Sequence, residues 1–405
     1  MQPLSTSRQT YLDWLRIFAI AGVLFFHCAR PFMEDDPWHV NNATQSGLLS
    51  EFAFWLSRFR MHLLFFISGT ISWYMVKRKS AAGFVGLRFR RLFIPLLVGM
   101  FIIVPPQIYF ERVQHGYQGS FWSWYPNTFD FQPYPKGNFS WHHLWFIAYL
   151  LVYDILLAPF FAWATSPKAA KFVEKLGYFA KGKRVYWFIA PSAIWFSALI
   201  LQYPDTNDLI HDPCFFVYWM LFLLAGFLFV LQPALMDSLE RNRRTSLAFA
   251  FLMIVTINVF RWNDIEIDTL WGGENWKSHP LTYLYLARMP LNSWLWVFAL
   301  VGYGKRYFNK QHRLLPYLNQ AIYPFYILHQ TVIVVFAFYV VQTNDTIDMK
   351  YLFLVISTFL FCMIAYHVFI RPFNVMRFLF GMKPKSAITP LPPIEKPQPA
   401  TSQVN

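Results

Sequence analysis

Long apolar stretches with few charges recur along this chain and limit what it can fold into. A helix needs about 20 apolar residues to cross the hydrocarbon core of a bilayer. Ten stretches approach that length, at 14–33, 52–76, 92–110, 141–163, 184–203, 214–231, 245–261, 281–302, 321–341 and 351–371. Hydrophobic residues make up 56% of the chain and charged residues only 14%, too few to cover the surface of a soluble protein. The sequence therefore predicts an all-α integral membrane protein with about ten transmembrane helices.

The loops between these stretches alternate in charge. Basic residues gather at 77–91, 168–184, 241–244 and 305–313. Acidic residues gather at 34–36, 205–212, 264–274 and 345–348. Because Lys and Arg concentrate in the cytoplasmic loops of membrane proteins, the basic loops and both chain termini are predicted on the cytoplasmic side.

The net charge of +14 does not indicate nucleic-acid binding, because the excess lies beside the predicted spans, where topology and anionic lipid explain it. Cys28, Cys214 and Cys362 are isolated inside predicted spans and are interpreted as small core residues. The end of the chain is rich in Pro and lacks apolar periodicity. We expect a membrane domain over 1–385 and a disordered tail over 386–405.

Arg16 and His27 interrupt the first apolar stretch. They are eleven residues apart, which is close to three helical turns, so they share one face about 16 Å apart along the axis. A charged residue inside a membrane span is costly and therefore suggests function. Arg16 alone is explained by snorkelling to the interface. His27 is less easily explained in that way, because a neutral imidazole is the natural general base near neutral pH.

The second stretch carries its own polar stripe. Glu51, Arg58 and His62 fall on one helical face, with Arg60 beside them. Two interpretations stand equally: a structural ion pair between Glu51 and Arg58, or a role in binding substrate.

The ninth stretch places Asn319, Tyr323, Tyr326 and Gln330 on one face, with His329 slightly to the side. Tyrosines near the ends of spans are commonly interfacial anchors, and this account suffices for Tyr323. It does not explain His329.

The fourth stretch contains the adjacent residues His142 and His143, and Asp154 lies eleven residues after His143. The two histidines lack the i, i+4 spacing of a helical metal pair, so no metal site is predicted. Asp154 is expected to be the buried partner of another polar group.

Five stretches together resemble the acyltransferase 3 (AT3) family of membrane acyltransferases over residues 8–380. The most specific is YLDWLRIFAIAGVLFFHCARPF at 11–32, which is similar to the family's first-helix signature of Arg, ten residues and His. That signature falls on Arg16 and His27. The others are FRMHLLFFISG, RFRRLFIP, HHLWFIAYLL and YPFYILHQ. The family's Arg-x-x-Arg element, which precedes its third helix, falls on Arg88 and Arg91.

The resemblance implies a membrane domain of about ten spans in a bacterial cytoplasmic membrane, an acyl-CoA donor and His27 as the essential catalytic residue. No permanently bound cofactor is expected. An acetyl- or succinyl-class group would pass from cytoplasmic acyl-CoA to a hydroxyl of a glycan or another carbohydrate. Without the family pattern, Arg88 and Arg91 are explained as topology determinants.

Such a transfer needs a base, cations for the donor's phosphates and a group that stabilises the oxyanion. We expect His27 to be the base and Arg16, Arg88 and Arg91 to bind the phosphates. Tyr326 and His329 are candidates for orienting the acceptor or stabilising the oxyanion. The alternative is a transporter or flippase of sugar-linked or lipid-linked substrates, because buried Arg, His and Asp also suit a conduction path.

Overall fold

The computed structural model describes residues 9–34, 38–265 and 273–385, and the regular secondary structure within them is helical. The only extended pairing in these ranges is an isolated bridge between Pro133 and Phe139. The α-helices are α1 (Thr10–Ala29), α2 (Gly47–Ser57), α3 (Arg60–Val76), α4 (Ala81–Val98), α5 (Pro105–Gln114), α6 (Phe121–Trp124), α7 (Trp145–Ala164), α8 (Ala170–Leu176), α9 (Ala190–Leu199), α10 (Pro213–Leu231), α11 (Pro233–Trp262), α13 (Pro280–Tyr307), α14 (Leu315–Val340), α15 (Ile347–Ala365) and α16 (Asn374–Leu379).

Short 3₁₀ turns and two π-helical segments join or extend these helices. The π segments are η2 (Gly99–Ile103) and η9 (Tyr366–Ile370). The 3₁₀ turns are η1 (Arg30–Phe32), η3 (Tyr125–Asp130), η4 (His142–Leu144), η5 (Pro167–Ala169), η6 (Gly177–Ala180), η7 (Arg184–Ile189) and η8 (Gly273–Ser278). The predicted tail, 386–405, lies outside the described residues, as do parts of the acidic loops 34–36 and 264–274.

Within the described residues, eight helical runs are long and apolar enough to cross a membrane. They are 10–32, 81–114, 142–164, 213–231, 233–262, 280–307, 315–340 and 347–370. The chain is therefore a multi-pass membrane protein. The count of ten spans and the cytoplasmic termini stay predictions.

The two remaining predicted spans are not single long helices. In 52–76 the chain turns at Arg58 and Phe59, whose backbone N–H groups bond to the carbonyls of Trp55 and Leu56 three residues back. This turn separates α2 from α3. In 184–203 the 3₁₀ turn η7 is followed by α9, which has ten residues. The prediction that Glu51, Arg58 and His62 share one helical face is wrong, because the turn between α2 and α3 changes the direction of the chain.

Arg88 and Arg91 lie inside α4, not in a loop before a span that begins at residue 92. Ser80 caps this helix, since its Oγ accepts a hydrogen bond of 3.2 Å from the Gly83 N–H. The helical run then continues through η2 and α5 to Gln114. The Arg-x-x-Arg element is therefore carried on a rigid helix.

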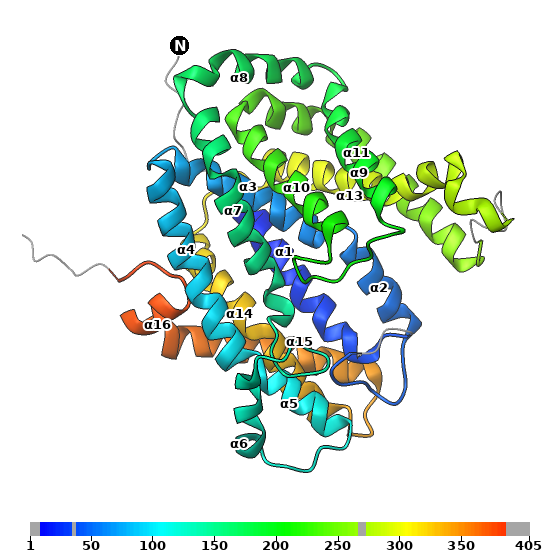
Figure 1. Cartoon of the computed structure of the whole chain (residues 1–405), viewed down its shortest axis with the longest axis vertical. Coiled ribbons are helices and arrows are strands. Elements are labelled where there is room, and N and C mark those ends of the chain that lie inside the picture. The colour runs from blue at the N-terminus through cyan, green and yellow to red at the C-terminus, as the bar shows by residue number, and fades with distance from the viewer. Residues whose placement is uncertain (1–8, 35–37, 266–272, 386–405) are drawn as a thin grey trace, which may run out of the picture.

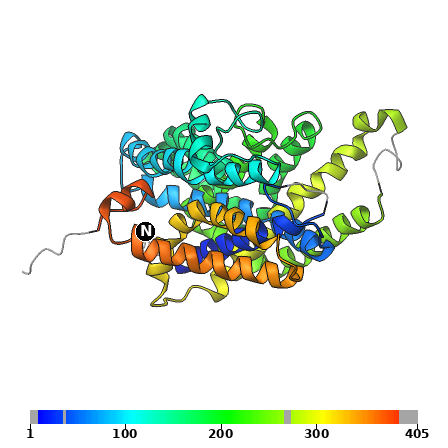
Figure 2. The ribbon, with the colours of Figure 1, turned by 90° about the horizontal axis from the view of Figure 1, so that it is seen from below.

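Helix α3 occupies the middle of the bundle and packs closely on α10. Glycine permits this approach at two positions: a Cβ on Gly69 would overlap the Leu223 carbonyl, and one on Gly226 would overlap the Phe66 carbonyl. Helices α11 and α13 pack along each other, and Figures 1 and 2 both show them extending away from the rest of the bundle.

We call the end of the bundle where α1 begins the inner end and the end where α1 finishes the outer end. Contacts between helix ends and distant loops agree with this division. At the inner end Thr10 donates to Asn309 at 2.9 Å. At the outer end Lys350 donates to Asn42 at 2.9 Å. Both contacts join segments that the loop charges assign to the same side of the membrane.

Candidate active site

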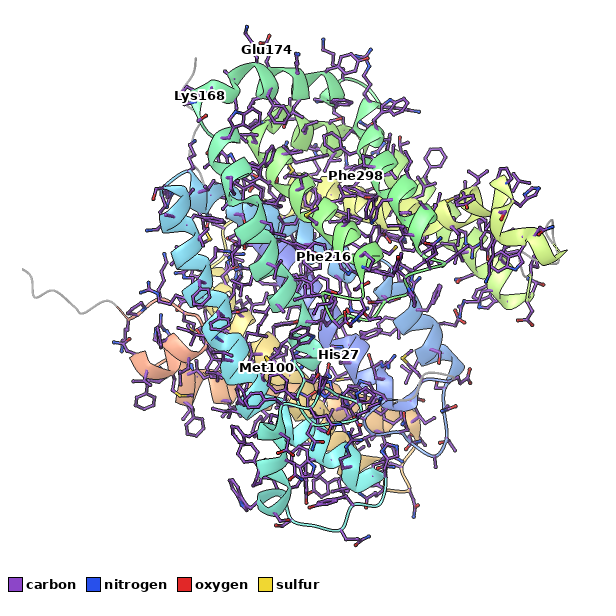
Figure 3. The ribbon with its side chains drawn as sticks, in the orientation of Figure 1. His27, Met100, Lys168, Glu174, Phe216 and Phe298 are labelled. Carbon is purple, nitrogen blue, oxygen red and sulfur yellow. The ribbon has the colours of Figure 1, made fainter. Side chains whose placement is uncertain are left out.

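Two histidines from opposite ends of the sequence meet in the bundle. His27 Nδ1 lies 2.8 Å from His329 Nε2, and His329 Nδ1 lies 2.6 Å from the Tyr326 carbonyl oxygen. His329 is buried with 1% of its surface exposed, and His27 is partly exposed. Figure 3 marks the position of His27 in the bundle.

The hydrogen-bond pattern assigns the tautomer of both rings. A carbonyl oxygen only accepts hydrogen bonds, so His329 Nδ1 carries a proton and donates a hydrogen bond to the Tyr326 carbonyl. In a neutral His329 ring, Nε2 then has the lone pair and accepts from His27 Nδ1–H. This arrangement leaves the lone pair of neutral His27 on Nε2, which is the nitrogen able to take a proton from a substrate.

The pairing of α1 with α14 creates this contact. Arg16 donates to Asn319 Oδ1 at 2.7 Å, and His27 meets His329 at 2.8 Å. The partners are eleven residues apart on α1 and ten on α14, so the two helices run parallel in nearly constant register. The polar residues of both spans therefore face each other at two levels of the membrane.

A third histidine supports the pair. His143 Nε2 donates to the Ile327 carbonyl at 3.0 Å, and its ring stands edge-on to His329 with centroids 5.2 Å apart. Gln107 lies 3.4 Å from His143 Nδ1 and donates to Thr331 at 2.6 Å. These contacts fix α14 against η4 and α5 around His329. His143 was noted in the sequence only as one of two adjacent histidines.

A further polar cluster lies at the outer end and was not predicted. His39 Nδ1 donates a buried hydrogen bond to the Glu111 carboxylate, and Gln330 lies 3.3 Å from His39. Tyr134 donates to Glu111 at 3.2 Å, and burial together with the nearby Glu111 carboxylate raises the pKa of Tyr134 to about 12. His39 and Tyr134 belong to loops without helical periodicity, so only the tertiary structure brings them together.

A cavity of about 960 Å³ opens at the inner end beside α1, α4 and α14. Its cationic lining residues are Arg16, Arg88, Arg91, Arg371, Arg377, Lys383 and Lys385. No Asp or Glu belongs to the lining among the described residues. The cavity therefore suits a ligand with several negative charges. Its lining reaches inward to Tyr326, whose carbonyl holds His329.

One of these cations has a buried carboxylate partner. Arg88 forms an ion pair with Asp154 of α7, and Asp154 also accepts a hydrogen bond of 2.7 Å from Ser72. Asp154 is completely buried. The prediction that Asp154 is the buried partner of another polar group is confirmed. Its carboxylate reduces the positive charge that Arg88 can offer a ligand.

The remaining candidates lie in different places. Arg60 stacks on Phe26 with its guanidinium carbon 3.4 Å from the ring centroid, and that ring lies 5.2 Å from the His27 ring. His62 is enclosed by aromatic rings of α10, such as Trp219 at 4.6 Å. Arg60 therefore borders the pair His27 and His329. His62 is a core residue whose ring contacts are with α10 and not with that pair.

The interpretation of Glu51 and Arg58 as an ion pair needs correction. Glu51 pairs with Arg261 of α11 and not with Arg58, because α2 ends at the turn that separates it from α3. Arg58 instead packs on the Phe54 ring at 4.3 Å. The hydroxyl of Tyr323 donates to the Arg91 carbonyl at 3.2 Å, and its role as an interfacial anchor stays a prediction.

Both the side-chain hydroxyl and the backbone carbonyl of Tyr326 form hydrogen bonds. Its hydroxyl donates to the His143 carbonyl, and its own carbonyl accepts from His329. The cysteines Cys28, Cys214 and Cys362 are buried, as predicted for small core residues.

Residues 9–367 match the model of the acyltransferase 3 family, which describes an acyltransferase domain. The chain belongs to this family. It is thus a membrane acyltransferase, and the family domain includes Arg16, His27, Arg88, Arg91 and His329.

Bacterial proteins named glucans biosynthesis protein C align over almost the whole chain. Glucans biosynthesis protein C of Escherichia coli O157:H7 (strain EC4115 / EHEC) is 24% identical over 404 residues, which cover 95% of this chain and 97% of the relative. The protein of the same name from Escherichia coli (strain K12) is 22% identical with the same coverage. No solved structure matches the chain significantly.

Proposed function

We propose that this acyltransferase moves an acyl group of the acetyl or succinyl class from cytoplasmic acyl-CoA to a hydroxyl of a carbohydrate, with His27 as general base. The observation that carries the proposal is the chain of hydrogen bonds from His27 through His329 to the carbonyl of Tyr326, a residue that also lines the cationic cavity. A base oriented in this way and a polyanion site meet two of the three requirements of the transfer, and the third is a group that stabilises the oxyanion.

The donor would enter the cavity from the inner side. The phosphates of acyl-CoA are polyanionic, and guanidinium groups such as those of Arg16 and Arg91 bind phosphate by charge-assisted hydrogen bonds. Arg16 and His27 are separated by about 16 Å along α1. The pantetheine arm would extend past Tyr326 and bring the thioester to His27.

The acceptor class follows from the relatives, whose name refers to the biosynthesis of glucans. A carbohydrate hydroxyl would reach His27 from the outer side, where the ring of Trp38 lies 6.3 Å from the His27 ring and nearly parallel to it. A bacterial cytoplasmic membrane fits both the multi-pass architecture and the bacterial relatives.

In the proposed reaction, His27 Nε2 removes the hydroxyl proton as the alcohol oxygen attacks the thioester carbonyl carbon. The resulting imidazolium is stabilised by its Nδ1–H bond to His329. Collapse of the tetrahedral intermediate breaks the carbon–sulfur bond, and the imidazolium returns the proton to the CoA sulfur. The products are the ester and free CoA.

Arg60 is the candidate for stabilising the oxyanion. It is a cation at the edge of the histidine pair, separated from His27 by the Phe26 ring. A fixed positive charge in a site shielded from water stabilises a developing anion strongly. Tyr326 is less suited, because its hydroxyl is already used by the His143 carbonyl.

Release of free CoA tests the proposal directly. Purified protein is given acetyl-CoA or succinyl-CoA with a glucan acceptor, and the new thiol and the mass of the glycan are measured. We expect thiol release that depends on acceptor, and Arg91→Ala should raise the KM for the donor. Glycan movement across vesicles without thiol release would instead support the transporter.

A further inference from the structure

Four of the seven cations around the cavity belong to one short segment near the end of the described chain. This segment, residues 371–385, contains α16 and is called here the C-terminal strap. Arg371, Arg377, Lys383 and Lys385 all line the cavity. The match to the acyltransferase domain ends at residue 367, so the strap lies outside the part of the chain that the family describes.

Internal hydrogen bonds give the strap a defined shape. Arg377 is buried, and it donates to the Lys383 carbonyl at 2.7 Å and to the Arg371 carbonyl at 3.2 Å. The Lys385 N–H donates to Asn374 Oδ1 at 2.8 Å. Arg377 therefore closes the strap into a loop, and the exposed side chains of Arg371, Lys383 and Lys385 remain at the cavity.

The strap is seated tightly on the wall of the cavity. Gly381 has a φ of +66°, and a Cβ there would overlap the Arg91 carbonyl and lie 2.9 Å from the Tyr323 ring. Helix α16 accordingly lies beside α4 (Figure 1). This contact places the strap next to Arg91, one of the cations expected to bind the donor.

The strap supplies much of the positive charge of the cavity that no carboxylate offsets. Arg88 is paired with Asp154. In the described part of the chain, Lys383 and Lys385 form no ion pair, and Arg371 lies over the Tyr317 ring at 5.2 Å. Cations that face a cavity without carboxylates are expected to bind an anion, and phosphate is the anion that Lys and Arg groups commonly bind.

We propose that the C-terminal strap binds phosphate groups at the nucleotide end of the acyl-CoA donor, through Lys383, Lys385 and Arg371. This inference rests on the proposed function, because it takes acyl-CoA as the ligand of the cavity. The same chemistry would also bind the phosphate of an anionic lipid headgroup, so the experiment separates the two sources.

The test compares two double variants that lose the same charge. Lys383→Gln with Lys385→Gln alters the strap, whereas Lys168→Gln with Lys171→Gln alters an exposed inner-end region that does not line the cavity. Lys168 is marked at the top of Figure 3, beside α8. The wild type and both variants are purified in nanodiscs of neutral lipid and, separately, of anionic lipid. The Kd for CoA is measured by calorimetry together with the melting temperature.

We expect the strap variant to bind CoA about tenfold more weakly than the wild type, while the control variant binds like the wild type. The strap variant should also bind adenosine 3′,5′-bisphosphate more weakly than the wild type does. This ligand has no pantetheine arm. Equal Kd values for strap variant and wild type in neutral lipid would overturn the proposal. A loss seen only in anionic lipid would assign the strap to lipid headgroups and would also overturn it.

Two further controls keep the outcomes distinct. If the wild type itself binds no CoA, the proposed function is contradicted, and not only the role proposed for the strap. If the strap double variant has a lowered melting temperature, the single variant Arg371→Gln provides the same comparison. Only the backbone carbonyl of Arg371 takes part in the internal hydrogen bonds of the strap, so this substitution leaves them in place.

Discussion

At the residue scale, the tautomer of His27 decides whether this side chain can act as a base. Its Nδ1–H is committed to His329, and His329 is committed to the Tyr326 carbonyl. The order resembles a triad in which a histidine and a backbone carbonyl replace the usual carboxylate. Because a carbonyl is neutral, the pair orients His27 and stabilises its imidazolium less strongly than an ion pair would.

Loss of the base is the first expected effect. His27→Ala should insert and fold normally but transfer acyl groups about 10²–10⁴ times more slowly, which is the usual contribution of general-base catalysis. Initial rates of CoA release by purified protein measure this effect. A correctly inserted variant with the wild-type rate would show that His27 is not the base.

His329 should matter less than His27, because it acts only through its hydrogen bond. Loss of a buried hydrogen bond costs about 1–3 kcal/mol, so His329→Ala should lower kcat about 5- to 150-fold. His329→Gln, which retains an acceptor, should recover part of that loss. The donor KM should stay unchanged in both. A raised KM with normal kcat would instead place His329 in substrate binding.

At the scale of elements, α4 carries two arginines with different surroundings. Arg88 is fixed to Asp154 of α7, and Arg91 lies at the cavity without such a carboxylate among the described residues. Arg88 therefore joins two membrane helices as well as lining the cavity. The sequence pattern treats both arginines alike.

Breaking the ion pair should destabilise the bundle. Asp154→Ala leaves the buried Arg88 guanidinium without its carboxylate, at a cost of about 3–5 kcal/mol. Asp237→Ala is the matched control, because it removes an exposed partner of Lys305 and should cost about 0–1 kcal/mol. Unfolding in mixed detergent measures both. Equal stability of the two variants would contradict a structural role for the Arg88 pair.

At the scale of the whole molecule, the contacts between distant loops agree with the alternation of loop charge. Lys350 reaches Asn42, and Trp141 donates to Asn207 at 3.0 Å. Asn42, Asn207 and Lys350 lie in segments predicted outside the cytoplasm, and Trp141 is the first residue of the predicted span that follows such a segment. Ten crossings would require α3 and the short α9 to cross as well.

Cysteine labelling tests this topology, and the three native cysteines are buried and should react little. Gln118→Cys and Ser278→Cys, at exposed positions, should react with an impermeant thiol reagent in intact cells. Lys171→Cys, also exposed, should react only after lysis. The opposite pattern would reverse the orientation.

The membrane class, the family and the shared helical face of Arg16 and His27 could be predicted from the sequence, because each depends on local composition or on spacing along one helix. The pairing of His27 with His329 depends on how α1 meets α14 across some 300 residues, which periodicity within either helix does not encode. The same reason applies to the His39–Glu111 pair and to the strap cations beside Arg91. Only tertiary packing brings these polar groups together, since each gains its partner from a distant segment and not from its own helix.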